Sequence, residues 1–562
     1  MQSMFKQLIL TTIIVSCATV AEAQRRTDRK AIDTTRPGTV VITSAYKPEL
    51  KTAAKITFSA AAPTKDSAKP SLNYVIPSQN LFFSYQPMPL QPLALEPDSA
   101  AEWRNSNYVK AGYGNFRTPY LETALSFGSS EASLAAFAKH ISSKSSLPFQ
   151  QFGRTQVELI GSLANMLDHQ WTAKAYFQNR SHYQYGFDAA KWMFSPDSLR
   201  RRFNTFGIGG GVKNASVNDY GITYNPSFEL NFHSDNRSAR ETNFLLDLPV
   251  EKALTKVFSL HLAVNVDVTS YRSDSASQSN NFFYVQPLVS YNTPNLLIKG
   301  GFTPAWDNSE FRLMPHLTAE AKLAEGGFKV MAGWVGRLVK NNYRSLSTLN
   351  PFIEEPRMLA NTRMNEIYAG LRGSAGNHFS YSARLAFVNF HNQPLFLNDT
   401  LAGNKFVTAF EPKLKAMRVH AEVGYTLQEK FSAVAGLTFN QYSGLEINDK
   451  AWHLPPVELS AALRWKVLRD LMVRSDLYFF EGPQYFEKTG IGTFSTAKLK
   501  PGIDLNLGAE FTVLPKLNVW VQFNNVFNNR YMRWNQYEVL GFQVVGGLSY
   551  SFGDLSKMIT SK

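Results

Sequence analysis

The residues of this chain that could do chemistry are acids and bases at alternate positions of extended segments. The set comprises Arg418, Glu422, Glu458, Arg464, Arg474 and Asp476. On the polar face of neighbouring strands they could form a conducting constriction or a ligand site. They could also neutralise one another, and each cross-strand pair would then contribute only about 0.2 to 1 kcal/mol. Mutual neutralisation is the more common arrangement and is the favoured interpretation.

Sequence signatures of enzymes are missing from the chain. It contains no H-E-x-x-H, no G-x-S-x-G, no Walker loop and no clustered calcium-loop carboxylates. The run Gly207-Ile208-Gly209-Gly210-Gly211 does not match a dinucleotide-binding loop, because Val212 stands at the last glycine position. We therefore expect no enzyme, no cofactor and no metal, although spacing alone leaves open a catalytic set assembled from distant Ser, His and Asp residues.

The N-terminus predicts export. Lys6 is followed by an apolar stretch over residues 8–20 and by Ala21-Glu22-Ala23, an A-x-A cleavage site before Gln24. Residues 1–23 would then be a signal peptide. Cys17 is the only cysteine, so ordinary cleavage leaves a chain without disulfides or thiolates. Alternatively, Cys17 closes a lipobox and is acylated, and mass spectrometry of the mature N-terminus would decide.

Residues 24–107 are rich in Pro, Ala, Ser and Lys and lack a sustained helical period, which predicts a largely irregular tail. One β-branched run interrupts this tail at Val40, Val41 and Ile42. Such a run could add as a strand to a sheet edge or to a periplasmic partner.

From Tyr108 to Phe552 the hydrophobic period is two, which indicates strands with two different faces. In the last segment, the apolar positions are Phe542, Val544, Leu548, Tyr550 and Phe552, and mostly polar or small residues lie between them. These runs extend for about ten residues or more, longer than the strands of soluble sandwiches. In lipid, strands span only as a closed sheet, so the sequence predicts a transmembrane, antiparallel, up-and-down β-barrel.

Loop lengths support the barrel, because short joints such as Arg469-Asp470 alternate with long polar segments such as 340–363. The segments number about 22, with an error of two either way, and both ends of the sheet lie on the periplasmic side. A barrel of that width cannot be filled by side chains. Aromatic residues at segment ends are expected to form the interfacial girdles; they are Tyr183, Tyr185, Phe187, Phe282, Phe283, Tyr284, Tyr531, Trp534 and Tyr537.

The formal net charge is +14, which permits attraction to anionic lipopolysaccharide or to anionic solutes. Scattered loop charges would give the same total. We expect contact with outer-membrane lipids and no nucleic-acid partner.

Residues 108–552 resemble the barrel of TonB-dependent receptors. The stretch 524–531 (NNVFNNRY), Trp534, Tyr537 and the end 546–552 (GGLSYSF) are similar to that family's C-terminal strands. Gly112-Tyr113-Gly114-Asn115 resembles its first-strand turn, and Ser345-Leu346 with Asn350-Pro351-Phe352 resembles one of its loops. The resemblance implies an outer-membrane protein of a Gram-negative bacterium.

The resemblance also implies two functional segments. The closing aromatic of the last strand is the family's signal for the barrel insertion machinery and matches Phe552, with Leu548 and Tyr550 on the same face; here the extension 553–562 makes that signal internal. Val40, Val41 and Ile42 resemble the segment that contacts TonB. The family's plug domain, however, has no room in the Pro-rich residues 24–107, so we expect a plugless barrel.

Two functional hypotheses follow. In the first, the barrel takes part in the passage of a solute across the outer membrane. In the second, it does not transport but holds a surface lipoprotein or belongs to an assembly or secretion complex, with the tail as its docking strand.

Overall fold

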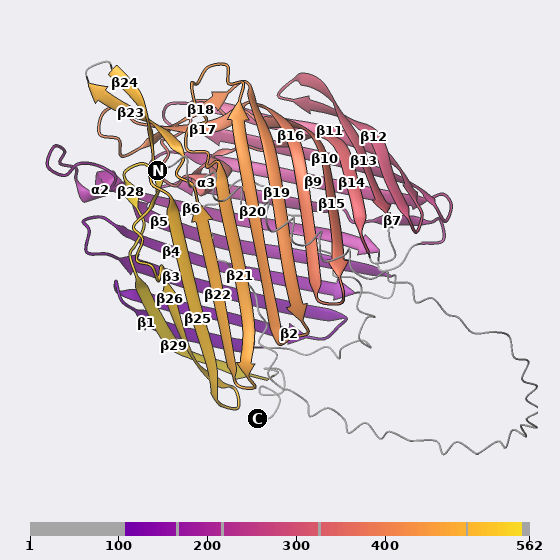
Figure 1. Ribbon diagram of the computed structural model, residues 1–562, viewed down its shortest axis with the longest axis horizontal. Helices are drawn as coiled ribbons and strands as arrows, with labels where there is room; N and C mark the ends of the chain where they lie inside the picture. Colours follow the sequence, from indigo (N-terminus) through magenta and orange to yellow (C-terminus); the bar gives the residue numbers. More distant parts are fainter. Residues whose placement is uncertain (1–106, 165–167, 215–217, 324–326, 491–492, 554–562) are drawn as a thin grey trace, which may run out of the picture. The chain divides into compact units, whose positions relative to one another are not determined.

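The structure is a computed structural model that describes residues 107–164, 168–214, 218–323, 327–490 and 493–553, apart from the side chains of 488–494. These residues form a closed, antiparallel β-barrel (Figure 1). Among them, neither helix is long and apolar enough to cross a membrane. The signal-cleavage residues Ala21, Ala23 and Gln24, the run Val40–Ile42 and residues 554–562 lie outside the described part.

The barrel wall consists of long strands that pair mostly with their sequence neighbours. They are β1 (Asn107–Gly114), β2 (Thr118–Gly128), β3 (Ala132–Lys144), β4 (Gln151–Ala164), β5 (His169–Tyr183), β6 (Arg200–Asn214), β7 (Ile222–Tyr224), β8 (Ser227–Asp235), β9 (Arg240–Ala253), β10 (Phe258–Arg272), β11 (Ser277–Asn292), β12 (Leu296–Asp307), β13 (Glu310–Lys322), β14 (Lys329–Val339), β15 (Thr362–Ala375), β16 (Phe379–His391), β19 (Leu414–Leu427), β20 (Phe431–Ser443), β21 (Val457–Leu468), β22 (Leu471–Phe480), β25 (Gly502–Leu514), β26 (Leu517–Asn524) and β29 (Gln543–Phe552).

The wall has 22 strands, which confirms the number predicted from the sequence. The pairings Tyr224↔Val250 and Ser227↔Asp247 keep one register along β9, so β7 and β8 are two parts of one interrupted strand.

The barrel closes where β1 pairs with β29, from Asn107↔Phe552 to Gly114↔Val545. Gly112 and Gly547 are direct partners at this seam. A Cβ on Gly547 would lie 1.9 Å from the carbonyl oxygen of Ala111, and one on Gly112 would lie 2.5 Å from the Trp520 ring. Glycine is needed at both positions because the strands and the Trp520 ring approach so closely.

The two faces of the wall differ as the period of two predicts. In β29, Leu548 and Tyr550 are 54% and 49% exposed, whereas Gln543 and Ser549 are 6% and 5% exposed. Large apolar side chains such as Phe302, Ile367 and Phe511 are likewise exposed on other strands. An apolar outer face on a closed sheet is the arrangement that hydrocarbon requires, and it confirms the predicted transmembrane barrel.

The two ends of the barrel carry different connections. At the end where β1 begins and β29 finishes, turns such as 469–470 and 515–516 are short. The opposite end carries the long loops 340–361, 392–413, 444–456, 481–501 and 525–542. Outer-membrane barrels place their short turns in the periplasm, so the long loops lie outside.

The long loops contain the remaining regular structure. It comprises the helices α2 (Pro196–Leu199) and α3 (Tyr343–Leu349) and the hairpins β17 (Gln393–Asn398) with β18 (Phe406–Glu411), β23 (Gln484–Gly490) with β24 (Thr493–Lys498), and β27 (Met532–Trp534) with β28 (Tyr537–Glu538).

Candidate functional site: a cap across the lumen

Four loop segments meet at the outer end of the barrel, and we call them the cap: residues 340–361, 392–413, 444–456 and 525–542. Segment 340–361 joins β14 to β15, yet it contacts strands far around the wall. The carbonyl oxygen of Pro351 lies 2.6 Å from His182 Nε2 on β5. Because those strands are separated by most of one half of the barrel, this segment crosses the lumen (Figure 1).

Helix α3 begins with a capping box. The side chain of Asn342 accepts a hydrogen bond from the amide of Ser345 at 2.8 Å, and the Ser345 hydroxyl lies 2.9 Å from the Asn342 amide that donates to it. This reciprocal pair satisfies two amides that a helix start leaves without partners. It fixes the direction of α3 and therefore the position of Tyr343.

Tyr343 joins α3 to a fully buried ion pair on the inner wall. Arg201 Nη2 on β6 lies 2.9 Å from Asp235 Oδ2 on β8, and both side chains are 0% exposed. The Tyr343 hydroxyl donates to Asp235 and accepts from Arg201, each at 2.7 Å. Burial raises the pKa of the Tyr343 hydroxyl well above its ordinary value, so the hydroxyl remains a donor.

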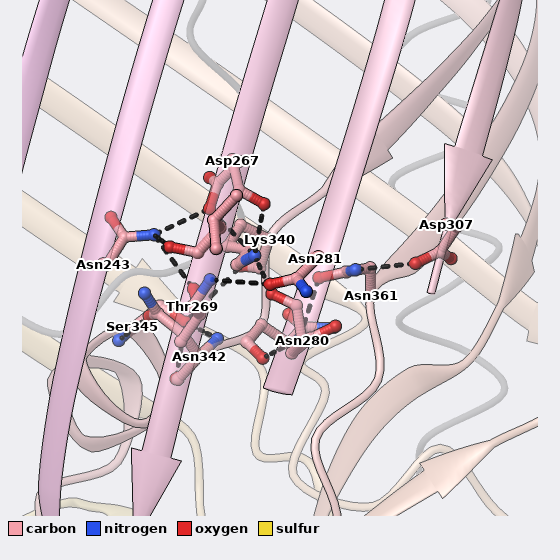
Figure 2. Close-up of polar contacts among 12 residues, drawn as sticks. Asn243, Asp267, Thr269, Asn280, Asn281, Asp307, Lys340, Asn342, Ser345 and Asn361 are labelled. Carbon is pink, nitrogen blue, oxygen red and sulfur yellow. Dashed lines mark hydrogen bonds and ion pairs between the residues drawn. The ribbon is translucent and has the colours of Figure 1, made fainter. Parts of the chain in front are cut away.

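A second anchor holds both ends of segment 340–361 against β10, β11 and β12, as Figure 2 shows. Lys340 Nζ lies 2.8 Å from Asp267 Oδ1 on β10. Asn280 on β11 donates to the carbonyl oxygen of Asn341 and to the side chain of Asn361, each at 3.0 Å. Asn361 in turn donates to Asp307 on β12 at 2.7 Å. We call this network, together with the Tyr343 contacts, the latch.

The centre of the cap is apolar. Its buried side chains come from the wall and from three of the cap segments: Phe203, Ala239, Tyr271, Tyr343, Leu346, Ile353, Leu359, Phe396, Phe406, Trp534 and Tyr537. Phe352 stacks on Tyr537 with ring centroids 3.5 Å apart and an interplanar angle of 18°. The cap therefore has its own hydrophobic core inside the mouth of the barrel.

His453 connects cap segment 444–456 to two other cap segments. Its Nδ1 lies 2.8 Å from the carbonyl oxygen of Phe396, and Arg533 donates to the backbone carbonyl oxygen of His453 at 2.7 Å. The side chain is 0% exposed, and burial lowers the pKa of His453 to about 3. The ring is therefore neutral and donates through Nδ1.

The aromatic residues expected to form girdles are partly misassigned by the sequence pattern. Tyr531, Trp534 and Tyr537 are only 6%, 4% and 3% exposed and pack inside the cap, so the girdle prediction was wrong for them. Phe282 is also buried and faces inward, with Lys340 Nζ 5.1 Å from its ring centre. A loop that folds inward buries its aromatics against other loops rather than at the membrane interface.

The six predicted lumen charges lie on the inner faces of β19, β21 and β22. Arg418 donates to Asn440 at 2.8 Å, Glu458 accepts from Tyr478 at 3.1 Å, and Arg474 donates to Gln522 at 3.2 Å. Their contacts therefore run mainly to neutral side chains on neighbouring strands. The remaining three, Glu422, Arg464 and Asp476, share that face, with Arg464 directly opposite Arg474 in the register.

Ion pairs of the expected cross-strand kind occur elsewhere on the inner wall. Glu366 contacts Arg384 at 2.7 Å and Arg337 at 3.3 Å, and Glu122 contacts Lys139 at 3.0 Å. The sequence pattern did not single out these residues, nor Asp235, Asp267 and Lys340 of the latch. The capping-box pattern at Asn342 and Ser345 was the available signal that an ordered helix interrupts the loop.

The residues of the expected insertion signal lie at the barrel seam. Phe552 is the last strand residue and pairs with Asn107, whose side chain donates to the carbonyl oxygen of Gly553 at 3.1 Å. Leu548 and Tyr550 point outward on the same face, and the rings of Tyr550 and Phe552 lie 6.1 Å apart.

A closed 22-strand barrel with an apolar outer face and long outer loops has the fold of outer-membrane barrels such as those of TonB-dependent receptors. The FrpB iron transporter of Neisseria meningitidis has a similar structure, with a TM-score of 0.63 and 11% identity over 80% of this chain and 82% of that one. The ferripyoverdine receptor of Pseudomonas aeruginosa gives a TM-score of 0.60 and 12% identity over 81% and 72%. For the ferric enterobactin receptor PfeA of the same bacterium, the values are 0.59 and 12% over 81% of both chains.

By sequence, no protein-family model and no curated protein matches the chain. At 10 to 12% identity the structural similarity concerns the fold. It confirms the predicted resemblance of the barrel and the outer-membrane location.

Proposed function

We propose that this protein takes part in the passage of a solute across the outer membrane and that the cap closes the outer mouth of the lumen. The observation that carries the proposal is the crossing of the lumen by segment 340–361, held by polar contacts to the inner wall. A barrel of this width leaves a lumen that side chains do not fill, so loops or another segment must control it.

The similar structures agree with a transport role, since two are named as receptors for ferric siderophores and one as an iron transporter. They lend no support to the alternative of a scaffold for surface lipoproteins or of an assembly complex. By extension, we propose that the solute of this chain is also an iron compound.

Conductance of the full mature chain in planar bilayers tests the proposal. Val339 and Thr362 are direct cross-strand partners, so residues 340–361 can be replaced by a two-residue Asn-Gly turn without disturbing the hairpin. We expect rare openings in the full chain and steady ohmic conductance in the shortened variant. Replacing residues 145–149 by a single glycine provides the matched control, because that loop lies at the same end outside the cap. Gln150 is kept, since its side chain donates to the carbonyl oxygen of Glu538 in the cap at 2.8 Å.

A shortened variant that conducts no more than the full chain would count against the cap as the closure. If neither the full chain nor a chain without residues 24–107 opened at all, solute passage itself would be refuted.

The run Val40–Ile42 supports a second, separate step of the proposal: docking of TonB or another periplasmic partner by strand addition. Binding of the full chain to purified TonB C-terminal domain tests this step. A Val41→Pro substitution removes a backbone donor and should abolish strand pairing. Retention of binding in that variant would remove the run from the contact.

A further inference from the structure

A pocket of about 120 Å³ lies between the cap and the inner wall of the barrel. It is bordered by the end of β14, by α3, and by residues of β15, β16 and β19. Since a water molecule takes about 30 Å³ in the liquid, the pocket has room for a few waters or one small organic molecule.

Three cationic side chains line this pocket: Arg337, Lys340 and Arg418. Arg418 is 5% exposed, and its Nε donates at 2.8 Å to the neutral amide oxygen of Asn440. None of the ion pairs found among the described residues includes Arg418. A guanidinium this deeply buried is costly unless an opposite charge lies beside it.

The ion pairs nearby leave Arg418 out. Glu366 is shared by Arg337 and Arg384, and Asp267 pairs with Lys340, which also interacts with Glu241 and Asp307. Glu458 acts on Arg418 electrostatically, but the two side chains form none of the ion pairs found among the described residues. An anion in the pocket would give the Arg418 guanidinium a charged partner in direct contact.

The rest of the lining is largely apolar. Leu346 and Leu349 come from α3, and Met364 and Phe390 come from β15 and β16. The Arg418 guanidinium lies over the Phe390 ring at 5.9 Å from its centre. An inorganic anion would leave this apolar surface without a partner, whereas a short alkyl chain would cover it.

We infer that the pocket binds a small organic carboxylate with a short alkyl chain, such as a four-carbon monocarboxylate. Its carboxylate pairs with Arg418, and its chain lies against the apolar side chains of α3 and the wall. Lys340 and Asn341 belong both to the pocket lining and to the attachment of segment 340–361. Occupancy therefore stabilises the closed position of the cap, and this site does not depend on the proposed transport role.

Saturation-transfer NMR on the full mature chain in detergent tests this inference, with sodium butyrate as the probe and butyramide as its uncharged analogue. Two variants remove the site in different ways. Arg418→Gln removes the charge, and Leu349→Trp fills the space while keeping the charge. Arg474→Gln is the matched control, because Arg474 also faces the lumen from the wall and donates to a neutral amide, that of Gln522. Heat-modifiable electrophoretic mobility reports correct folding of each variant.

We expect saturation transfer to butyrate in the wild type and in Arg474→Gln, and at least a tenfold weaker affinity in both pocket variants and for butyramide. Absence of butyrate binding in the folded wild type would overturn the inference. So would unchanged binding in folded Arg418→Gln or Leu349→Trp. Displacement of butyrate by equimolar inorganic phosphate would refute the part assigned to the alkyl chain.

Discussion

The latch makes a quantitative prediction for Tyr343→Phe. The substitution keeps the ring in the cap core but removes the hydroxyl that bridges Arg201 and Asp235 at 2.7 Å on each side. Hydrogen bonds to charged groups contribute about 1.5 to 3 kcal/mol, and here both partners are ionised and buried. Among the described residues, Arg201 Nε and Nη1 already lack a hydrogen-bond partner, so the site offers no spare acceptor that could replace the Tyr343 hydroxyl.

We therefore expect the free energy of local opening of α3 to fall by about 2 to 3 kcal/mol. At about 1.4 kcal/mol per factor of ten, the open population rises about 30- to 150-fold. Hydrogen–deuterium exchange of residues 343–349 measures this directly. Openings in planar bilayers should become more frequent by a similar factor if opening of α3 is what admits ions.

The control is Tyr108→Phe. The Tyr108 hydroxyl also donates to a carboxylate, Glu122, at 2.8 Å, but it lies at the periplasmic end of β1. This variant should leave exchange in α3 unchanged. Exchange of α3 in Tyr343→Phe within twofold of the wild type, in a folded barrel, would refute the latch.

Three further predictions concern other parts of the molecule. Glu411 is 0% exposed and accepts backbone hydrogen bonds from residues 446–448, so Glu411→Gln should speed amide exchange there by about tenfold or more. Burial lowers the pKa of His453 to about 3, so the neutral ring stabilises the cap near pH 7. This stabilisation is lost as the pH falls from about 6.5 towards 3, by at most about 1.4 kcal/mol per pH unit. Amide exchange in residues 444–456 should therefore become faster over this pH range, and in His453→Gln the exchange should no longer depend on pH in this way. Phe552→Ala should reduce the heat-modifiable, membrane-inserted fraction, and an unchanged fraction would limit Phe552 to a lipid contact.

The wall was predictable from the sequence because each strand meets two environments that differ sharply in polarity. The alternation in β29 separates Leu548 and Tyr550 from Gln543 and Ser549, and the structure has the same separation. The number of strands followed from counting those segments. Register at the interrupted strand of β7 and β8 could not be predicted, since Asn225 and Pro226 between them look like a turn.

The cap was not predictable by the same means. Its contacts join residues that are far apart in the sequence, such as Arg180 with Ser347 and Phe352 with Tyr537, and a loop carries no period that indicates its neighbours. The aromatic cluster after β26 was therefore assigned to the membrane interface. Of the six lumen charges predicted from alternation, Arg418 lines the pocket. Alternation did not identify the other two cations of the lining, Arg337 and Lys340.

The shape of the outer rim explains where segment 340–361 lies. The connections after β8, β10 and β12 are short, at residues 236–239, 273–276 and 308–309, so no long loop blocks this side of the mouth. The segment fills the space and meets polar groups at the upper ends of these strands, while its centre meets aromatics from the long loops of the other side. It is thus held by hydrogen bonds at the wall and by apolar burial at the centre. Water competes with the hydrogen bonds but not with the apolar contacts, so opening of the cap requires the loss of both the latch and the aromatic contacts around Tyr537.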